Sequence, residues 1–175
     1  QAEIEMAYLV QPDSGSVGVV VHYKNDKDQV LKETYWIQSG TAKGGKNYYV
    51  KQSTGEKHYL PAFEKMQNLT LLAAGKSINE LDTEEKVVKI YDYTSKADVP
   101  TPVQAITDLI GQPIVLGVVK QTVNKSAKQD DGSYKEIADT RQENEVTKFF
   151  RAEDNMTVAN CTTPDWHDIQ CFGVS

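Results

Sequence analysis

The chain is poor in cysteine and has no long apolar stretch, and both shortages narrow the class of protein it can be. Only two cysteines occur among 175 residues, Cys161 and Cys171, which argues against a disulfide scaffold and favours a reducing compartment, the cytoplasm. No apolar run approaches the roughly 18–20 residues that a membrane-spanning helix requires. We therefore expect a cytoplasmic protein without a membrane partner.

Positive charge is also scarce over the chain as a whole. The 19 Lys and Arg residues are outnumbered by 25 Asp and Glu, which gives a net charge of −6 and a pI near 5.1. Residues 39–60 depart from this balance, with four lysines (Lys43, Lys46, Lys51 and Lys57) against a single acid, Glu56. A basic patch on an acidic body binds polyanions locally, because the nearby field steers association while the acidic remainder opposes indiscriminate binding.

Residue spacings typical of catalysis and of metal binding are missing as well. Cys161, His167 and Cys171 are six and four residues apart, whereas structural zinc sites use ligand pairs two to four residues apart. The loop 40–47 nearly matches the phosphate-binding pattern G-x-x-x-x-G-K-[ST], but Asn47 lacks the hydroxyl that ligates Mg²⁺ and a strand pattern follows it. No Ser-His-Asp or Cys-His arrangement is recognisable. The sequence thus predicts no enzyme, no metal ion and no cofactor.

Hydrophobic periodicity indicates a mainly β chain with inserted helices. Strands are expected at 17–23, in three runs within 31–60, and at 87–93, 113–123, 134–137 and 145–150. Pro61 opens a helix that ends at Gly75, and a shorter helix is expected over 103–110. This order favours an OB-like five-stranded barrel with extra strands and hairpins, a single domain over 1–158, and an irregular tail over 159–175.

The stretch 31–60 concentrates aromatic rings and lysines on three expected strands joined by two turns. Because side chains alternate across a strand, we place Ile37, Val50 and Leu60 in the core. Tyr35 and Tyr48 then also point inward. The opposite face carries one lysine and one aromatic ring from each run: Lys32 and Trp36, Tyr49 and Lys51, and Lys57 and Tyr59. A one-residue slip in register would exchange Trp36 for Tyr35.

Aromatic rings beside ammonium groups on one sheet face form a surface on which unpaired bases stack while the lysines neutralise phosphates. Each stacked base contributes roughly 1–3 kcal/mol, whatever its identity. The same pattern is also typical of cross-strand packing pairs and of lysines kept exposed for solubility. On the binding interpretation, the stacking residues are Trp36, Tyr49, Tyr59 and Tyr91, and the phosphate contacts are Lys32, Lys43, Lys46, Lys51, Lys57 and Lys89.

Two late blocks carry a resemblance to a known family. GVVKQTVN at 117–124 and RQENEVTKFF at 141–150, together with the order of the aromatic-lysine strands, resemble bacteriophage single-stranded DNA-binding proteins of the OB-fold class. The resemblance covers most of residues 17–158. It implies sequence-tolerant binding and protection of single-stranded DNA during phage replication and recombination in the host cytoplasm, with replication proteins as further partners. Many members end in an acidic tail, and the chain departs there, because residues 165–175 hold only two acids.

Other interpretations of the same residues stay open. The exposed aromatics would equally serve a protein-interaction or phage structural module, in which self-association replaces nucleic-acid binding. An enzyme whose site has no recognisable spacing is a third class. RNA is not separated from DNA, because nothing in the sequence identifies a reader of the 2′-hydroxyl.

Overall fold

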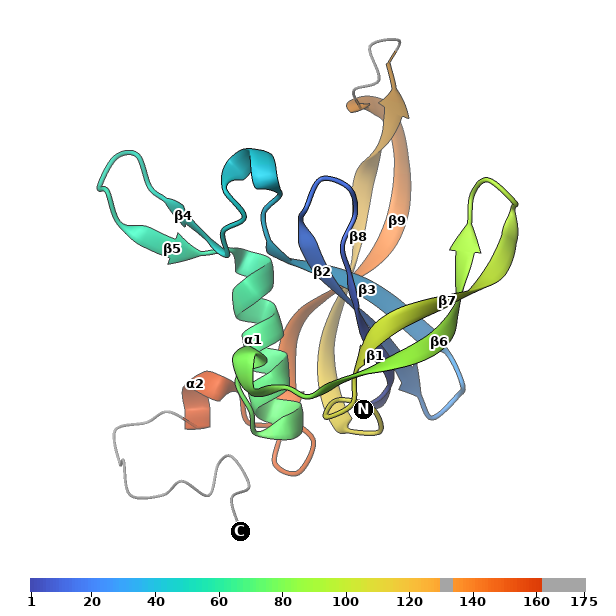
Figure 1. Cartoon of the computed structure of the whole chain (residues 1–175). Helices are drawn as coiled ribbons and strands as arrows, with labels where there is room; N and C mark the ends of the chain where they lie inside the picture. Colours follow the sequence, from blue (N-terminus) through green and yellow to red (C-terminus); the bar gives the residue numbers. More distant parts are fainter. Residues whose placement is uncertain (130–133, 162–175) are drawn as a thin grey trace.

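The structure is a computed structural model and describes residues 1–129 and 134–161 (Figure 1). The predicted mainly β class with an inserted helix is confirmed. The strands are β1 Ala2–Val10, β2 Val17–Asn25, β3 Val30–Gln38, β4 Tyr48–Val50, β5 Lys57–Tyr59, β6 Thr83–Asp92, β7 Ala97–Ile106, β8 Pro113–Lys128 and β9 Tyr134–Arg151. The helices are α1 Pro61–Ala74 and α2 Val158–Cys161, with short 3₁₀ turns η1 Thr41–Lys43 and η2 Ile78–Glu80.

Seven strands form one antiparallel sheet, and β4 and β5 form a second, separate sheet of two strands. The large sheet runs β3-β2-β1-β7-β6, and β1 is its shared strand, because its first residues pair with β8 while Tyr8 pairs with Ala105 of β7. Within the described residues, β3 pairs only with β2 and β9 only with β8. The sheet is therefore open, whereas the sequence analysis predicts a closed five-stranded barrel.

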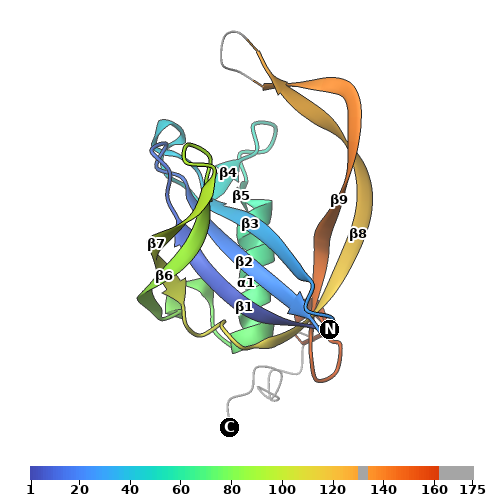
Figure 2. The same cartoon turned by 90° about the vertical axis from the view of Figure 1, so that its right-hand side faces the viewer.

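The inserted helix α1 packs against one face of the sheet (Figure 2) and contacts both β3 and β9. It begins at Pro61 and ends before Gly75, which has a positive φ of 67°, as the sequence predicts. Met66 and Leu69 are fully buried on its inner side. The main core also contains Ile4, Ala7, Val19, Val21, Tyr23, Tyr35, Leu72, Ile106, Leu109, Ile114, Val146 and Phe149.

A second, smaller core lies on the opposite face of the sheet. Tyr8, Val20 and Val103 are buried there, and Val88 and Ile90 of β6 pack against them. The β6–β7 hairpin thus covers the face of β1 and β2 that α1 leaves open. Burial on both faces explains why the sequence of β2 is nearly continuous in apolar residues.

Four predicted features of the secondary structure are wrong or incomplete. The helix expected over 103–110 is not formed, because β7 continues to Ile106 and a turn leads to Gly111. Val103 and Ala105 are buried while Gln104 is exposed, which is strand alternation. The segment expected as a long polar tip, 124–133, is strand as far as Lys128, and its last four residues lie outside the described part. Likewise, 134–137 and 145–150 belong to one continuous strand, β9, and the start of the tail expected to be irregular is helix α2.

A carboxylate joins the unpaired edges of β3 and β9. Glu33 accepts a hydrogen bond from the Val146 N–H at 2.6 Å with one oxygen, and one from the Tyr35 hydroxyl at 2.6 Å with the other. The Tyr35 and Tyr23 hydroxyl oxygens are 3.1 Å apart, and burial raises the pKa of both groups, so both stay protonated donors. Lys65 on α1 donates to the Val146 carbonyl at 3.1 Å. Side chains thus satisfy the backbone groups of Val146 at this edge.

We expect Glu33→Ala to lower the free energy of unfolding by about 1–3 kcal/mol, because the Val146 N–H and the Tyr35 hydroxyl both lose an acceptor. Urea denaturation measures the loss. Glu85→Ala, which removes an exposed carboxylate from β6, is the matched control and should change stability by less than about 0.5 kcal/mol. Equal losses for the two variants would show that Glu33 does not hold the edges together.

Candidate functional site

The segments that carry most of the predicted residues lie at one end of the molecule. The β1–β2 turn, η1, the β4–β5 hairpin and the tip of the β6–β7 hairpin all lie in the upper part of Figure 1, and Figure 2 shows the same arrangement after a quarter turn. The N-terminus and the β2–β3 turn lie at the lower end. The upper end is therefore where we look for a binding surface.

The β4–β5 hairpin projects from the start of α1 with its own register. Tyr48 pairs with Tyr59, and Val50 with Lys57, so these four side chains share one face. Tyr49 pairs with His58 and occupies the other face. The expectation that Tyr49 and Tyr59 share a face is therefore wrong, as is the placement of Val50 in the core, since Val50 is 48% exposed. The cause is that β4 and β5 do not pair with β3, so the large sheet does not set their faces.

One face of the hairpin combines aromatic rings with ammonium groups. The Nζ atoms of Lys46 and Lys57 lie 5.5 and 5.1 Å from the centroid of the Tyr48 ring, within the range of cation–π attraction. The Tyr59 ring stacks on Phe63 of α1, with centroids 5.0 Å apart and planes 27° from parallel. We call Lys46, Tyr48, Lys57, Tyr59 and Phe63 the lysine-aromatic face.

The other face of the hairpin holds a second stacked pair. The rings of Tyr49 and His58 are 5.6 Å apart with an interplanar angle of 27°, and both side chains are about half exposed. The His58 Nε2 lies 3.7 Å from a Glu56 oxygen. We call Tyr49 and His58 the tyrosine-histidine face. The hairpin thus presents stacked rings on both of its sides.

The glycine-lysine loop that precedes the hairpin is fixed by backbone contacts. The Thr41 N–H donates to the Ser14 carbonyl at 2.9 Å, and a Cβ atom on Gly40 would lie only 2.6 Å from that same oxygen, so glycine is required. Ser39 and Lys46 close the loop, with Ser39 N–H to Lys46 carbonyl at 2.8 Å and Lys46 N–H to Ser39 Oγ at 2.9 Å. The loop holds only the short η1 turn and leads into β4, so the helix of a nucleotide-binding loop is missing from it.

Trp36 points away from the main core, as the alternation predicts. Tyr35 is 3% exposed and Trp36 is 45% exposed. The Trp36 ring lies over Gly18 of β2, where an added Cβ would be 2.9 Å from the ring atom Cε3. Lys32 is exposed on the same face, opposite His22, whose pKa is lowered first by burial and then by the nearby Lys32 charge. His22 is therefore a neutral, packed residue at pH 7.

A third surface is the outer side of the β6–β7 hairpin. Lys89 and Tyr91 point outward there, because Val88 and Ile90 alternate with them and pack into the second core. Tyr91 stands edge-on to Tyr93 at 5.2 Å, and Tyr93 is 86% exposed. The predicted residues are exposed as expected, but they are distributed over three surfaces: the β3 face, the β4–β5 hairpin with its loop, and the β6–β7 hairpin.

Three members of the hairpin surface were missed from the sequence. Tyr48 was expected to point inward, and His58 and Phe63 were not assigned to a binding surface. The tight turn after β4 contains the signal that would have found them. The Lys51 carbonyl accepts from the Gly55 N–H at 2.8 Å, and this closure places Tyr48 opposite Tyr59. Counting the hairpin register outward from that turn, independently of β3, gives the observed faces.

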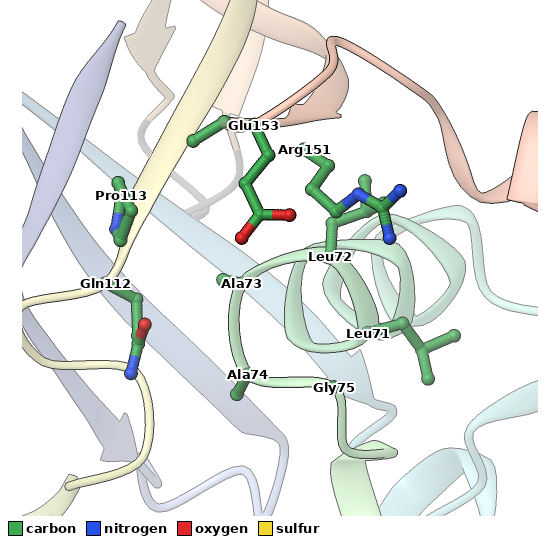
Figure 3. A pocket seen from close by; sticks show the side chains of 10 residues that line it. Leu71, Leu72, Ala73, Ala74, Gly75, Gln112, Pro113, Arg151 and Glu153 are labelled. Atoms are coloured by element: carbon green, nitrogen blue, oxygen red, sulfur yellow. The ribbon is translucent and has the colours of Figure 1, made fainter. Parts of the chain in front are cut away.

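An open pocket of about 240 Å³ lies elsewhere, at the C-terminal end of α1 (Figure 3). Leu72 and Ala73 line it on the helix side, and Gln112, Arg151 and Glu153 contribute polar groups. Arg151 forms an ion pair with Asp154, whose pKa is lowered chiefly by that hydrogen bond. Of the cysteine-histidine group considered for a metal, His167 and Cys171 lie outside the described residues.

No protein-family model, curated protein or solved structure matches the chain. Across the described ranges, none of the helices is both long and apolar enough to cross a membrane. The fold and the geometry of the exposed residues are therefore the grounds on which a function is proposed.

Gly18→Ala should displace the Trp36 ring, because its Cβ would overlap the ring and also lie 3.1 Å from Val10. We expect a red-shifted Trp36 emission and a loss of about 1–3 kcal/mol in unfolding free energy. The spectrum is read in a Trp166→Phe background, which leaves Trp36 as the single tryptophan. In a Trp36→Ala chain the same glycine substitution should cost less than half as much. An unaltered emission spectrum would contradict the packing of Trp36 on Gly18.

Proposed function

We propose that the protein binds single-stranded DNA without sequence preference and protects it during phage replication and recombination. The observation that carries this proposal is the β4–β5 hairpin, whose rings lie outside both hydrophobic cores. Tyr49 and Tyr59 are 48% and 54% exposed, and every residue from Lys51 to Tyr59 is exposed. The hairpin makes no pairing with the large sheet.

The exposed rings favour a ligand over a purely structural role. Cross-strand aromatic pairs ordinarily stabilise a sheet by covering apolar surface, and a two-stranded hairpin alone gains little from this in water. The β4–β5 sheet has strands of only three residues and carries four aromatic or histidine rings at its surface. These rings therefore add little to the stability of the fold. Exposed aromatic rings that are bordered by polar groups are typical of binding surfaces.

The local charge favours a polyanion as that ligand. Lys43, Lys46, Lys51 and Lys57 are all exposed, against the single acid Glu56 in residues 39–60 of an otherwise acidic chain. Lys46 and Lys57 flank a ring, which is the combination that lets a base stack while its phosphates are neutralised. The same combination of an aromatic ring and a lysine occurs on two further surfaces. These are the β3 face, with Trp36 and Lys32, and the β6–β7 hairpin, with Tyr91 and Lys89. A strand with unpaired bases fits the rings, whereas a duplex hides its base faces.

We also interpret the open sheet as OB-like. Three features support this: the β1–β3 meander, the principal helix inserted before the next strand of the large sheet, and β1 shared between two groups of strands. The Glu33 bridge between β3 and β9 joins the two edges that would meet in a closed barrel.

A subunit interface is the second candidate, and the β8–β9 ribbon favours it. The ribbon projects from the body in Figure 2, and Val118, Val119 and Ile137 on it are 45%, 48% and 38% exposed. A long two-stranded ribbon is marginally stable in water unless something covers it. Self-association through this ribbon is compatible with DNA binding at the hairpin.

Tyr59→Ala and Tyr48→Ala should each weaken oligothymidine binding about 5- to 100-fold, because each removes the binding free energy of about one stacked base. Lys46→Ala and Lys57→Ala should each reduce the slope of log affinity against log salt by about 0.7. Fluorescence anisotropy of a labelled oligonucleotide measures both effects. Lys27→Ala is the charge-matched control, because Lys27 is exposed in the β2–β3 turn at the opposite end. If the hairpin variants bind as tightly as Lys27→Ala, the hairpin is not the DNA site.

A further inference from the structure

The β4–β5 hairpin carries stacked rings on both faces, and one single strand lying along one face leaves the other unused. The register places Tyr59 on the lysine-aromatic face and Tyr49 on the tyrosine-histidine face. Both tyrosines are about half exposed. A base that stacks on Tyr59 and a base that stacks on Tyr49 are therefore separated by the thickness of the hairpin.

We propose that the hairpin is a wedge that enters a junction between single-stranded and double-stranded DNA and receives one strand on each face. This inference rests on the proposed binding of single-stranded DNA and names the form of DNA that the site prefers. At such a junction the last base pair opens to expose two bases on two diverging strands. A thin ribbon with an aromatic ring on each side matches that arrangement, because each ring replaces the stacking that one base loses.

Hydrogen bonds close the hairpin at its base and at its tip. At its base, the Leu60 N–H donates to the Asn47 carbonyl at 2.8 Å, and the Tyr59 ring is stacked on Phe63 of α1. At its tip, the Lys51 N–H donates to the Glu56 carbonyl at 2.9 Å, and the Lys51 carbonyl accepts from Gly55. Contacts at both ends fix the hairpin without using either core, so its faces stay open.

The two faces differ in charge, which assigns a role to each. The lysine-aromatic face has two ammonium groups beside the Tyr48 ring and suits the strand that is bound along its phosphates. On the tyrosine-histidine face the register places one lysine, Lys51, at the turn, where its backbone N–H donates to the Glu56 carbonyl. His58 on this face lies 3.7 Å from a Glu56 oxygen. That face suits a single base of the displaced strand, held by stacking rather than by phosphate contacts.

The experiment compares three ligands by anisotropy: a single-stranded oligonucleotide, a blunt duplex, and a forked duplex whose tails have the length of the single strand. We expect the wild-type chain to bind the fork about tenfold more tightly than the single strand, as one additional stacked base provides. Tyr49→Ala should weaken fork binding at least fivefold more than it weakens single-strand binding. Tyr49→Phe, which keeps the ring, is the matched control and should retain the fork preference. Tyr59→Ala should weaken binding of both ligands.

A fluorescent base analogue at the terminal base pair of the fork supplies a second readout. Its emission should rise when the wild-type chain binds, because the pair opens, and should rise less with Tyr49→Ala. Equal affinity for fork and single strand in the wild-type chain would overturn the wedge while leaving single-strand binding intact. An equal loss for both ligands in Tyr49→Ala would also overturn it, because Tyr49 would then belong to the single-strand site. Failure to bind any of the three ligands would remove the proposed function itself.

Discussion

The structure depends on how two unpaired strand edges are brought together. β3 and β9 do not form a ladder, but α1 contacts both strands, and Glu33 of β3 binds the Val146 N–H of β9 and the Tyr35 hydroxyl. Because Lys65 of α1 binds the Val146 carbonyl, the helix is fixed to the same point of β9. The first turn of α1 in turn carries Phe63, on which the hairpin ring Tyr59 stacks. The position of the hairpin thus follows from the way the edges are held.

The sequence predicted those parts of the fold where pattern and environment agree. The 17–23 strand was recognisable because both of its faces are buried, and α1 because proline and glycine mark its ends. The helix expected over 103–110 failed because a run of apolar residues shows the spacing of a short helix and of a buried strand equally well. Only the pairing of Val103 and Ala105 with β6 separates the two. The pattern ends β8 too early, at residue 123, and divides β9 into two strands, because an exposed ribbon has no buried face to impose alternation.

The same reasoning separates the correct from the incorrect part of the candidate site. Trp36 was correctly placed outward because β3 belongs to a sheet with a buried face, which fixes Tyr35 inward. Extending that face to β4 and β5 predicts the orientation of Tyr48, Tyr49 and Tyr59 incorrectly, because these two strands form their own sheet. The exposure of a residue is therefore predictable from composition and alternation. Predicting which other residues share its face requires the pairing register.

The separation of the hairpin from both cores also explains how an acidic protein keeps a basic, aromatic surface. Residues that pack into a core are constrained by volume and polarity, so a ring or a lysine placed there for binding would cost stability. The hairpin rings contact one another, two lysines and Phe63 at the edge of α1. The turn sets the register of these rings, while the sheet and α1 carry both hydrophobic cores. Because backbone hydrogen bonds close the hairpin at both ends, substitutions on its exposed faces leave those bonds in place, and the proposed binding residues can be altered with little change to the fold.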